Sequence, residues 1–378
     1  MLRPPARVAV IGAGTMGSMV LWHLARRGVG AVGFDPYAPG HDHGAAGGAS
    51  RIFRLAYREG AQYVPLLRAA REKWLELQNA WHEPLFDPCG ALTVGPEAHP
   101  DVARVLDVAR AGRVPVDVLD RKESERRYPQ HQLDDEDVTV VDPHGGLLRP
   151  DRAIRAAAAA ARAHGAELRT GTSVTGLEAD DGGVRVTAGG RGERFDTAVV
   201  CAGPWTTDLL PEVARAVELR RAVLGWFEPE EAAAEGFAPE RFPVGIRRGS
   251  AAYSFFPAHD GHGVKMNLYA PKAVVSHPRE LSGAVEPDYR ERMGAAAASG
   301  LRGLRPGPAR TAAYLDGYTP DNHGLLGPVS GLPGVLAMAG FSGHGFKLSP
   351  VFGEIAADLL TEGRTAHGIE HLRVHRFG

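Results

Sequence analysis

Three glycines near the start of the chain have the spacing of a phosphate-binding turn. Gly12, Gly14 and Gly17 follow the apolar run 8–11 directly, and Asp35 closes the next apolar run. The first glycine permits a tight turn, the second lets backbone approach a pyrophosphate, and the third lets a helix pack closely on the strand. The helix N-terminus offers N–H groups to phosphates, and an acid at position 35 can accept hydrogen bonds from a ribose diol. The pattern predicts a dinucleotide site made of Gly12, Ala13, Gly14, Thr15, Met16, Gly17 and Asp35.

A second glycine-rich turn lies near the C-terminus. Residues 340–347 read GFSGHGFK, between an apolar run and an amphipathic helical pattern. Backbone N–H groups and the positive end of a helix dipole stabilise negative charge, such as that on the N1–C2=O edge of a reduced flavin. Lys347 is poorly suited to a helix start, which favours a functional role. A simple tight turn with a solvated lysine remains the alternative.

Further basic residues stand where they could reach the same site. Arg51 and Arg54 follow the Gly/Ala-rich loop 43–50, and a helical turn would direct both side chains to one place. Lys265 shares one face of a predicted strand with Asn267 and Tyr269. Structural ion pairs for the arginines, and an exposed strand lysine, are the alternatives that spacing leaves open.

Composition restricts the class of protein. The 378 residues are 23% charged and 44% hydrophobic, with a formal net charge of -2. This balance gives no indication of nucleic acid or an anionic membrane as a partner. We find no apolar run of transmembrane length and no signal peptide, and two cysteines cannot form a disulfide framework or a metal knuckle. We expect a cytoplasmic protein without a metal.

The order of elements predicts an α/β fold with two domains. Strand and helix patterns dominate 1–83, 150–216 and 317–378, which we assign to a discontinuous Rossmann-type domain. Short strand-like runs separated by Gly and Pro dominate 84–149 and 217–316, and the second of these reads as an antiparallel meander. We assign these two insertions to an α+β substrate domain built on an antiparallel sheet.

Four strings resemble one family over essentially the whole length. They are GAGTMG at 12–17, SRIFRLAY at 50–57, CAGPW at 201–205 and GFSGHGFK at 340–347, the last being the most specific. The chain resembles the monomeric sarcosine oxidase and N-methyltryptophan oxidase family of FAD-dependent amine oxidases, within the D-amino-acid-oxidase-like superfamily. The resemblance implies FAD as cofactor. Besides the first motif and Asp35, it implies contacts from Ser50, Arg51, Val174, Ala202, Gly203, Trp205, Gly340, Gly343, His344, Gly345, Phe346 and Lys347.

The resemblance also implies a reaction. A carboxylate-bearing amine, or amino acid, gives a hydride to flavin N5, the imine product is hydrolysed, and O2 reoxidises the flavin to yield H2O2. By position, Arg54 and Lys347 would grip the substrate carboxylate. Arg51 would lie close to the flavin, and Lys265 would assist electron transfer to oxygen, so these two are the catalytic candidates. Tyr253, Tyr269 and Asp316 complete the predicted substrate site.

One departure from the family concerns how the flavin is held. The family usually attaches flavin through a cysteine six residues before the proline of a T-P-D string, and here that position holds Tyr314. Neither Cys89 nor Cys201 belongs to that segment. We therefore predict tightly bound, non-covalent FAD.

Other departures concern the pocket. The family's His-His-Gly-Asp-Thr-Arg loop is 46–51 here, AGGASR, so an imidazole near the flavin is missing. Tyr269 replaces a histidine and Asp316 replaces a tyrosine. Asp316 could bind a cationic or hydroxylated part of the substrate, or pair with Arg247 or Arg248. An aspartate facing the flavin makes a secondary or cyclic amino acid larger than sarcosine the better hypothesis.

Other functions stay open at this stage. The nearest alternative is a flavin-dependent amino acid dehydrogenase that uses another electron acceptor, against which Lys265 argues weakly. An NAD-linked dehydrogenase, a flavin monooxygenase and a non-catalytic FAD-binding relative are more distant. The expected partners are a small amine substrate and O2, in a monomer or small homo-oligomer.

Overall fold

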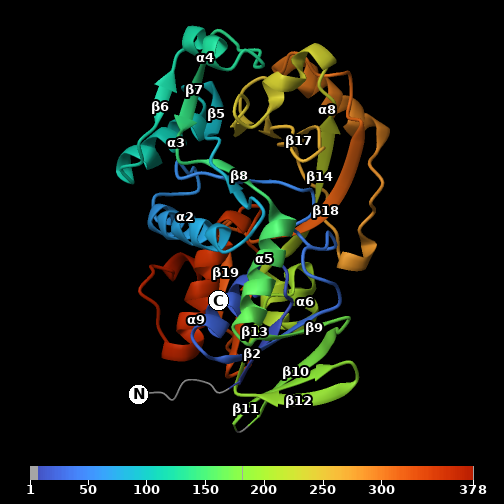
Figure 1. The fold of residues 1–378 in the computed structure, drawn as a ribbon. Helices are drawn as coiled ribbons and strands as arrows, with labels where there is room; N and C mark the ends of the chain where they lie inside the picture. The colour runs from blue at the N-terminus through green and yellow to red at the C-terminus, as the bar shows by residue number, and fades with distance from the viewer. Residues whose placement is uncertain (1–6, 181, 378) are drawn as a thin grey trace.

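The computed structural model describes residues 7–180 and 182–377. It has the mixed α/β architecture that we predict, with a parallel sheet and a separate, mostly antiparallel sheet (Figure 1). The parallel sheet lies in the lower half of this view, and the larger sheet lies in the upper half.

The parallel sheet is formed from both ends and the middle of the chain. In spatial order its strands are β19 (Leu325–Pro328), β20 (Val335–Ala339), β13 (Thr197–Val200), β1 (Arg7–Ile11), β2 (Gly30–Asp35) and β9 (Glu167–Thr170). Every pairing is parallel except that of β19 with β20. The carboxyl ends of β1, β2 and β13 therefore meet at one edge of the sheet, where ligands bind in such folds.

Strand β1 divides its side chains between two hydrophobic cores. Val8 and Val10 pack in the core with the long helices α1 (Thr15–Arg26), α2 (Tyr63–Asn79), α5 (Pro150–Ala163) and α9 (Ser349–Glu362). Ala9 and Ile11 face the other core, with the meander β10 (Val174–Asp180), β11 (Gly183–Ala188) and β12 (Arg191–Phe195) and the short helices α6 (Thr206–Leu209) and α7 (Pro211–Ala216). An all-apolar strand is expected when both faces of a parallel sheet are covered.

The larger sheet draws strands from both insertions. In order they are β18 (Arg310–Tyr318), β14 (Glu218–Phe227), β17 (Val264–Leu268), β16 (Tyr253–Phe256), β15 (Val244–Arg247), β5 (Ala91–Pro96), β7 (Asp137–Asp142) and β6 (Asp117–Leu119). The pairing of β15 with β5 is parallel and the others are antiparallel. The meander is thus extended by strands of the first insertion. Helices α3 (Pro100–Ala111), α4 (Arg121–Arg127) and α8 (Pro287–Gly300) accompany this sheet.

Alternation along the larger sheet decides which side chains can reach a ligand. On β16 and β17, Tyr253, Phe255 and Met266 are buried in the core of this domain. Phe256 and Lys265 alternate with them and therefore point to the opposite face. That face looks toward the parallel sheet.

A small antiparallel sheet joins the two parts. It contains β3 (Arg51–Phe53), β8 (Gly146–Leu148) and β4 (Phe86–Asp87). The helical turn that we expect across Arg51 and Arg54 is therefore wrong, because the backbone of β3 pairs with β8 instead. We keep the predicted two-domain division as an interpretation of the two large sheets.

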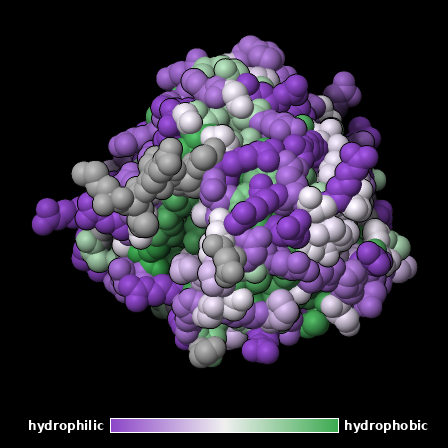
Figure 2. Space-filling view, turned by 90° about the horizontal axis from the view of Figure 1, so that it is seen from below, coloured by the Kyte–Doolittle hydropathy of each residue, from purple (hydrophilic) through white to green (hydrophobic). Residues whose placement is uncertain are grey.

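Short 3-10 turns complete the described part of the chain. They are η1 (Gly203–Trp205), η2 (Glu231–Phe237), η3 (Pro278–Glu280), η4 (Phe346–Leu348), η5 (Glu370–Leu372) and η6 (Val374–Phe377). Among the described residues, no helix is both long and apolar enough to cross a membrane. Figure 2 shows a mostly hydrophilic face on which hydrophobic side chains appear mainly in one recess.

Candidate active site

A single large cavity runs between the parallel sheet and the larger sheet. Its volume is about 1450 Å³, above the roughly 300–1,000 Å³ of common ligand pockets. Its lining residues include the glycine turn after β1, and also Arg54, Lys347 and Asp316. The cavity is therefore large enough for an extended cofactor and a small substrate together.

Most of the predicted site residues line this cavity. They are Gly12, Gly14, Thr15, Met16, Asp35, Arg51, Arg54, Val174, Ala202, Gly203, Trp205, Lys265, Tyr269, Asp316, Gly340, Gly343, His344, Gly345, Phe346 and Lys347. Ala13, Gly17, Ser50 and Tyr253 are not among the lining residues. Ala13, Gly17 and Ser50 still belong to segments whose other residues line the cavity.

The glycines of the first turn have different tasks. Gly12 has a φ of +86°, and a Cβ there would lie 2.5 Å from the carbonyl oxygen of Cys201. A Cβ on Gly17 would lie 1.7 Å from the carbonyl oxygen of Gly12, so this helix start tolerates no side chain. Gly14 has no protein atom within 4 Å of its Cβ position. Two glycines are thus required by the protein's own packing, and the third keeps space open on the cavity side.

Asp35 is buried beside the first turn. Its Oδ2 accepts a hydrogen bond of 2.8 Å from the N–H of Ala13, and its Oδ1 accepts one of 2.9 Å from Tyr37. The Nε2 of His41 lies 3.5 Å from Oδ1. The carboxylate holds two loops together at the edge of the cavity, where its remaining lone pairs can meet a ribose hydroxyl.

Arg51 holds the Gly/Ala-rich loop in shape. Its guanidinium donates to three backbone carbonyl groups, those of Ser50 at 2.7 Å, Ala45 at 2.6 Å and Gly47 at 2.7 Å. A planar group with five N–H donors suits such a set of acceptors. The loop is therefore bound to a fixed cation that also lines the cavity.

Lys265 reaches the same loop from β17. Its Nζ donates to the carbonyl oxygens of Gly48 at 3.0 Å and Ser50 at 2.6 Å, and lies 3.8 Å from the ring centroid of Phe256. Burial, with the nearby charges of Arg51 and Arg310, holds the pKa of Lys265 well below its ordinary value. The structure thus brings both catalytic candidates to one loop.

Arg54 presents unpaired donors in a buried position. The residue is 7% exposed, and its Nε and Nη1 atoms are buried without a hydrogen-bond partner among the described residues. Its backbone is fixed because Asp142 Oδ2 accepts the N–H groups of Leu55 at 2.6 Å and Ala56 at 2.9 Å. A buried guanidinium with free donors calls for an anion.

Lys347 and Arg54 both lie near the ring of Tyr57. The Tyr57 ring centroid is 5.5 Å from the guanidinium carbon of Arg54 and 5.0 Å from Nζ of Lys347. Nζ donates to the carbonyl of His344 at 3.2 Å. Burial lowers the pKa of Lys347 to about 7. The two cations therefore converge on one region of the cavity.

Sequence reasoning missed Glu59, which also lines this region. Its Oε2 lies 3.8 Å from Arg54 Nη2, and its Oε1 accepts a bond of 3.1 Å from Arg58. Burial would raise the pKa of Glu59, but the positive charges of Arg54, His344, Arg58 and Lys347 hold it below its ordinary value. No motif marks this residue, because its role depends on how the loop after Arg54 folds back.

The two aromatic residues assigned to substrate are placed differently. Tyr269 is 42% exposed and lies at the cavity, with the guanidinium of Arg248 3.5 Å from its ring centroid. Tyr253 is fully buried in the core of the larger sheet, on the face away from the cavity. Tyr253 is therefore not retained as a substrate contact, because the alternation of β16 turns it away.

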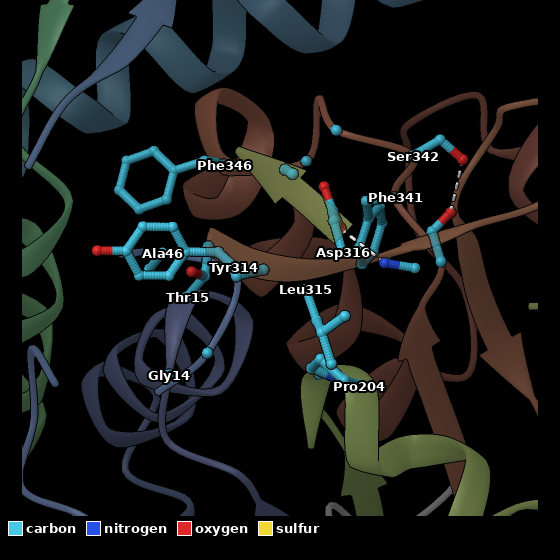
Figure 3. Close-up of a pocket in the computed structure, with 18 of the residues that line it drawn as sticks. Gly14, Thr15, Ala46, Pro204, Tyr314, Leu315, Asp316, Phe341, Ser342 and Phe346 are labelled. Atoms are coloured by element: carbon cyan, nitrogen blue, oxygen red, sulfur yellow. Dashed lines mark hydrogen bonds between the residues drawn. The ribbon is translucent and has the colours of Figure 1, made fainter. Parts of the chain in front are cut away.

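Asp316 faces the cavity from β18, with an intermediate exposure (Figure 3). The alternative that it pairs with Arg247 or Arg248 is wrong. Arg247 pairs with Asp137 at 2.9 Å, and Arg248 pairs with Asp101 at 2.5 Å. Asp316 is thus free of the partners that sequence reasoning offered.

The position expected for a flavin-linking cysteine holds Tyr314, whose ring lies against Gly47. Cys201 lines the cavity beside the first glycine turn, with its Sγ 3.6 Å from Met338 Sδ, and burial raises its pKa. Cys89 does not line the cavity. Neither cysteine belongs to the segment of Tyr314.

The residues present fit FAD. The open space beside Gly14, the carboxylate of Asp35 and the length of the cavity suit a dinucleotide. Ala46, Tyr314 and Phe346, labelled in Figure 3, also line the cavity, so small and flat side chains are among its lining residues. Gly343 has a φ of +81° in the second turn, whose residues also line the cavity.

The family of the chain follows from comparison with known proteins. A family model described as FAD dependent oxidoreductase matches residues 7–359. The chain belongs to this family, and it is an oxidoreductase with FAD as its cofactor.

Individual relatives agree with the family. A monomeric sarcosine oxidase of Streptomyces avermitilis is 33% identical over 374 residues, which cover 97% of each chain. An N-methyl-L-tryptophan oxidase of Salmonella dublin is 29% identical, covering 97% of this chain and 98% of that protein. These matches confirm the resemblance read from the four strings.

Solved structures show the same fold. NikD, an unusual amino acid oxidase essential for nikkomycin biosynthesis, has a TM-score of 0.84 at 22% identity, covering 98% of this chain and 97% of its own. An L-proline dehydrogenase from P. horikoshii has a TM-score of 0.85 at 19% identity, covering 100% and 98%. At these identities the likeness concerns the fold alone.

Proposed function

We propose that the chain is an FAD-dependent oxidase of a secondary or cyclic amine that carries a carboxylate. The observation that carries this proposal is the pair of unpaired Arg54 nitrogens beside Lys347, inside the cavity. Two relatives of nearly full coverage are named for oxidation of sarcosine and N-methyl-L-tryptophan, which are N-methyl amino acids. A guanidinium and an ammonium together suit a carboxylate.

We propose separate roles for the basic residues that line the cavity. Arg54 and Lys347 bind and orient the carboxylate, which fixes the amine carbon in the cavity. Bound FAD supplies the oxidising power, accepting a hydride equivalent at N5 as the amine becomes an imine. Arg51 and Lys265 hold the 45–50 loop and contribute fixed positive charge beside it.

We propose O2 as the electron acceptor, with H2O2 as product. The support is Lys265, a buried cation facing the cavity from β17. A dehydrogenase using another acceptor is the second candidate, because burial and the charges of Arg51 and Arg310 lower the pKa of Lys265 and so disfavour its charged form. Purified holoenzyme is tested with sarcosine, N-methyl-L-tryptophan and L-proline in an oxygen electrode. Oxygen uptake with equimolar H2O2 supports the oxidase, whereas turnover only with an added dye supports the dehydrogenase.

We propose that a bulkier amino acid is a better substrate than sarcosine. The cavity of about 1450 Å³ and the acidic side chain of Asp316 within it support this. The same oxygen electrode compares kcat/KM for the three compounds. Faster turnover of sarcosine than of both larger compounds would contradict it.

The flavin is proposed to be non-covalent. Tyr314 has no nucleophilic sulfur, and neither Cys89 nor Cys201 belongs to that segment of the chain. Precipitation of the holoenzyme with trichloroacetic acid is expected to leave the yellow colour in the supernatant. Colour that stays with the protein pellet would contradict non-covalent binding.

A cytoplasmic monomer or small homo-oligomer is part of the proposal. Both cysteines are free, which suits a reducing compartment. Light scattering on the purified holoenzyme checks the size of the particle in solution.

A further inference from the structure

The carboxylates that line the cavity differ in whether they have an ion-pair partner. They are Asp35, Glu59, Asp101, Asp208, Asp316 and Asp321. Five of them have an Arg or His nitrogen within 4.0 Å. Within the described part of the chain, Asp316 forms no ion pair at that distance, although it faces the same cavity.

The surroundings of Asp316 stabilise its charge only in part. Its Oδ1 accepts a hydrogen bond of 2.9 Å from the N–H of Gly317. Burial raises its pKa, while Lys272, Arg51 and the backbone N–H groups of Gly317 and Gly343 act in the opposite direction. The Lys272 ammonium is engaged elsewhere, since it donates to the hydroxyl of Tyr318. Asp316 therefore forms no direct ion pair in the described part of the chain, although the charges of Lys272 and Arg51 act on it and Arg220 lies opposite it on β14.

Several basic side chains line the rest of the cavity. The carboxylate end has Arg54, Arg58 and Lys347, and the loop side has Arg51 and Lys265. An amino acid whose amine is protonated would meet repulsion from these groups. A carboxylate of intermediate exposure without a direct ion-pair partner offsets that repulsion and favours a cation.

We propose that Asp316 binds the ammonium group of the substrate and takes its proton before oxidation. This inference rests on the proposed function, since it needs a substrate held by its carboxylate at Arg54 and Lys347. In the step, an N–H bond of the ammonium breaks and an O–H bond forms on Asp316. The lone pair stays on nitrogen, which leaves the neutral amine ready to be oxidised by the bound FAD. The proton then passes to solvent.

The binding half of the proposal is tested without turnover. Trimethylglycine is a carboxylate with a permanent cation, and 3,3-dimethylbutyrate has the same shape without the charge. Both are titrated into the holoenzyme, and the change in flavin absorption gives each Kd. We expect trimethylglycine to bind about 10- to 100-fold more tightly, a range typical of one hydrogen-bonded or paired charge. D316N should reduce that ratio to near one.

The outcomes separate this proposal from the proposed function. A ratio near one in the wild type, or a ratio that D316N leaves unchanged, overturns the role of Asp316. Failure of both ligands to bind the wild type contradicts the carboxylate site itself, and with it both proposals. Asp208→Asn is the matched control, because Asp208 lines the cavity but pairs with His277 at 3.1 Å. It should keep the wild-type ratio.

The proton-transfer half is tested by the pH dependence of anaerobic flavin reduction. The substrate is whichever of sarcosine and N-methyl-L-tryptophan bleaches the wild type faster. The wild-type rate should reach a plateau once Asp316 is ionised. In D316N the rate should rise about tenfold per pH unit up to the pKa of the amine and approach the wild type there, because only free amine then reacts.

Further results test proton transfer to Asp316. D316E should restore part of the neutral-pH plateau, since it keeps an acid in place. A D316N profile parallel to the wild type would overturn proton transfer. Loss of FAD from D316N, or a changed flavin spectrum without ligand, would place Asp316 with the cofactor and also overturn the proposal.

Discussion

Arg54 and Lys347 lie against one tyrosine ring, yet their electrostatic situations differ. Arg54 has a guanidinium with unpaired donors, whereas Lys347 has an ammonium whose pKa burial lowers to about 7. Binding of an anion beside Lys347 therefore competes with loss of its proton as the pH rises. The residue makes the carboxylate site sensitive to pH.

This gives a prediction for the affinity of a simple carboxylate. Below about pH 7 Lys347 is protonated, so its contribution to the Kd of 3,3-dimethylbutyrate should not change with pH. Above it, binding must include uptake of a proton, so Kd should rise by up to about tenfold per pH unit. Flavin absorption titrations from pH 6 to 9 measure this.

Lys347→Met should weaken binding at pH 6 and remove the rise above pH 7. The variant Lys122→Met, on the exposed surface of α4, serves as the control. A wild-type Kd that does not change between pH 6 and 9 would contradict the role of Lys347. Ionisation of Asp316 also weakens the binding of an anion as the pH rises. This effect does not involve Lys347, so the Lys347→Met variant keeps it.

Among the elements, the 45–50 loop depends on two cations. Arg51 holds it from β3, and Lys265 holds it from β17, through separate backbone carbonyls. Each strand belongs to a different sheet, so the loop connects the two parts of the molecule beside the cavity.

Lys265→Met should therefore affect the reaction with oxygen most. Methionine fills a similar volume but supplies no charge and no donor to the loop. We expect reoxidation of the reduced enzyme by O2 to slow at least about tenfold, with a smaller change in anaerobic reduction. Stopped-flow absorption measures both steps. Equal slowing of the two steps would indicate a role in holding the loop alone.

Gly14, in the turn after β1, allows effects on protein stability to be measured separately from effects on FAD binding. A Cβ on Gly14 meets no protein atom within 4 Å, although the backbone there, with a φ of -74° and a ψ of -144°, lies outside the regions that alanine prefers. Gly14→Ala should lower apo-protein stability by about 1–3 kcal/mol through its backbone conformation, while FAD affinity of the folded protein falls at least about tenfold.

Thermal unfolding of the apo-protein and flavin fluorescence titration measure the two effects. Gly331→Ala is the control, since Gly331 is exposed and its Cβ position is equally open. Unchanged FAD affinity in Gly14→Ala would contradict the placement of the pyrophosphate at this turn.

At the scale of the whole molecule, the sequence predicted the architecture well. The glycine turns, the parallel strands and the long helices have strong local patterns, and these are confirmed. The parallel pairing of β15 with β5 was not predictable, because it joins residues that lie about 150 positions apart. Arg51 was expected on a helical turn, since its pairing with Leu148 of β8 joins residues about 100 positions apart in the chain.

The candidate site was predictable where a motif marks it. Arg54, Lys265 and Lys347 stand in recognisable strings, and the structure brings them to one cavity. Tyr253 was misplaced because a one-residue step along a strand reverses the face. Glu59 and Asp142 have no sequence signal, since their contacts depend on how distant segments fold back.

The central claim is that bound FAD oxidises an amine held by its carboxylate. Anaerobic bleaching of the flavin tests it most directly, with N-methyl-L-tryptophan and with N-methyltryptamine, which lacks only the carboxylate. We predict full bleaching by the amino acid, at a rate at least about 100-fold above that with the amine. Equal bleaching by both compounds, or bleaching by none of N-methyl-L-tryptophan, sarcosine and L-proline, would contradict the account.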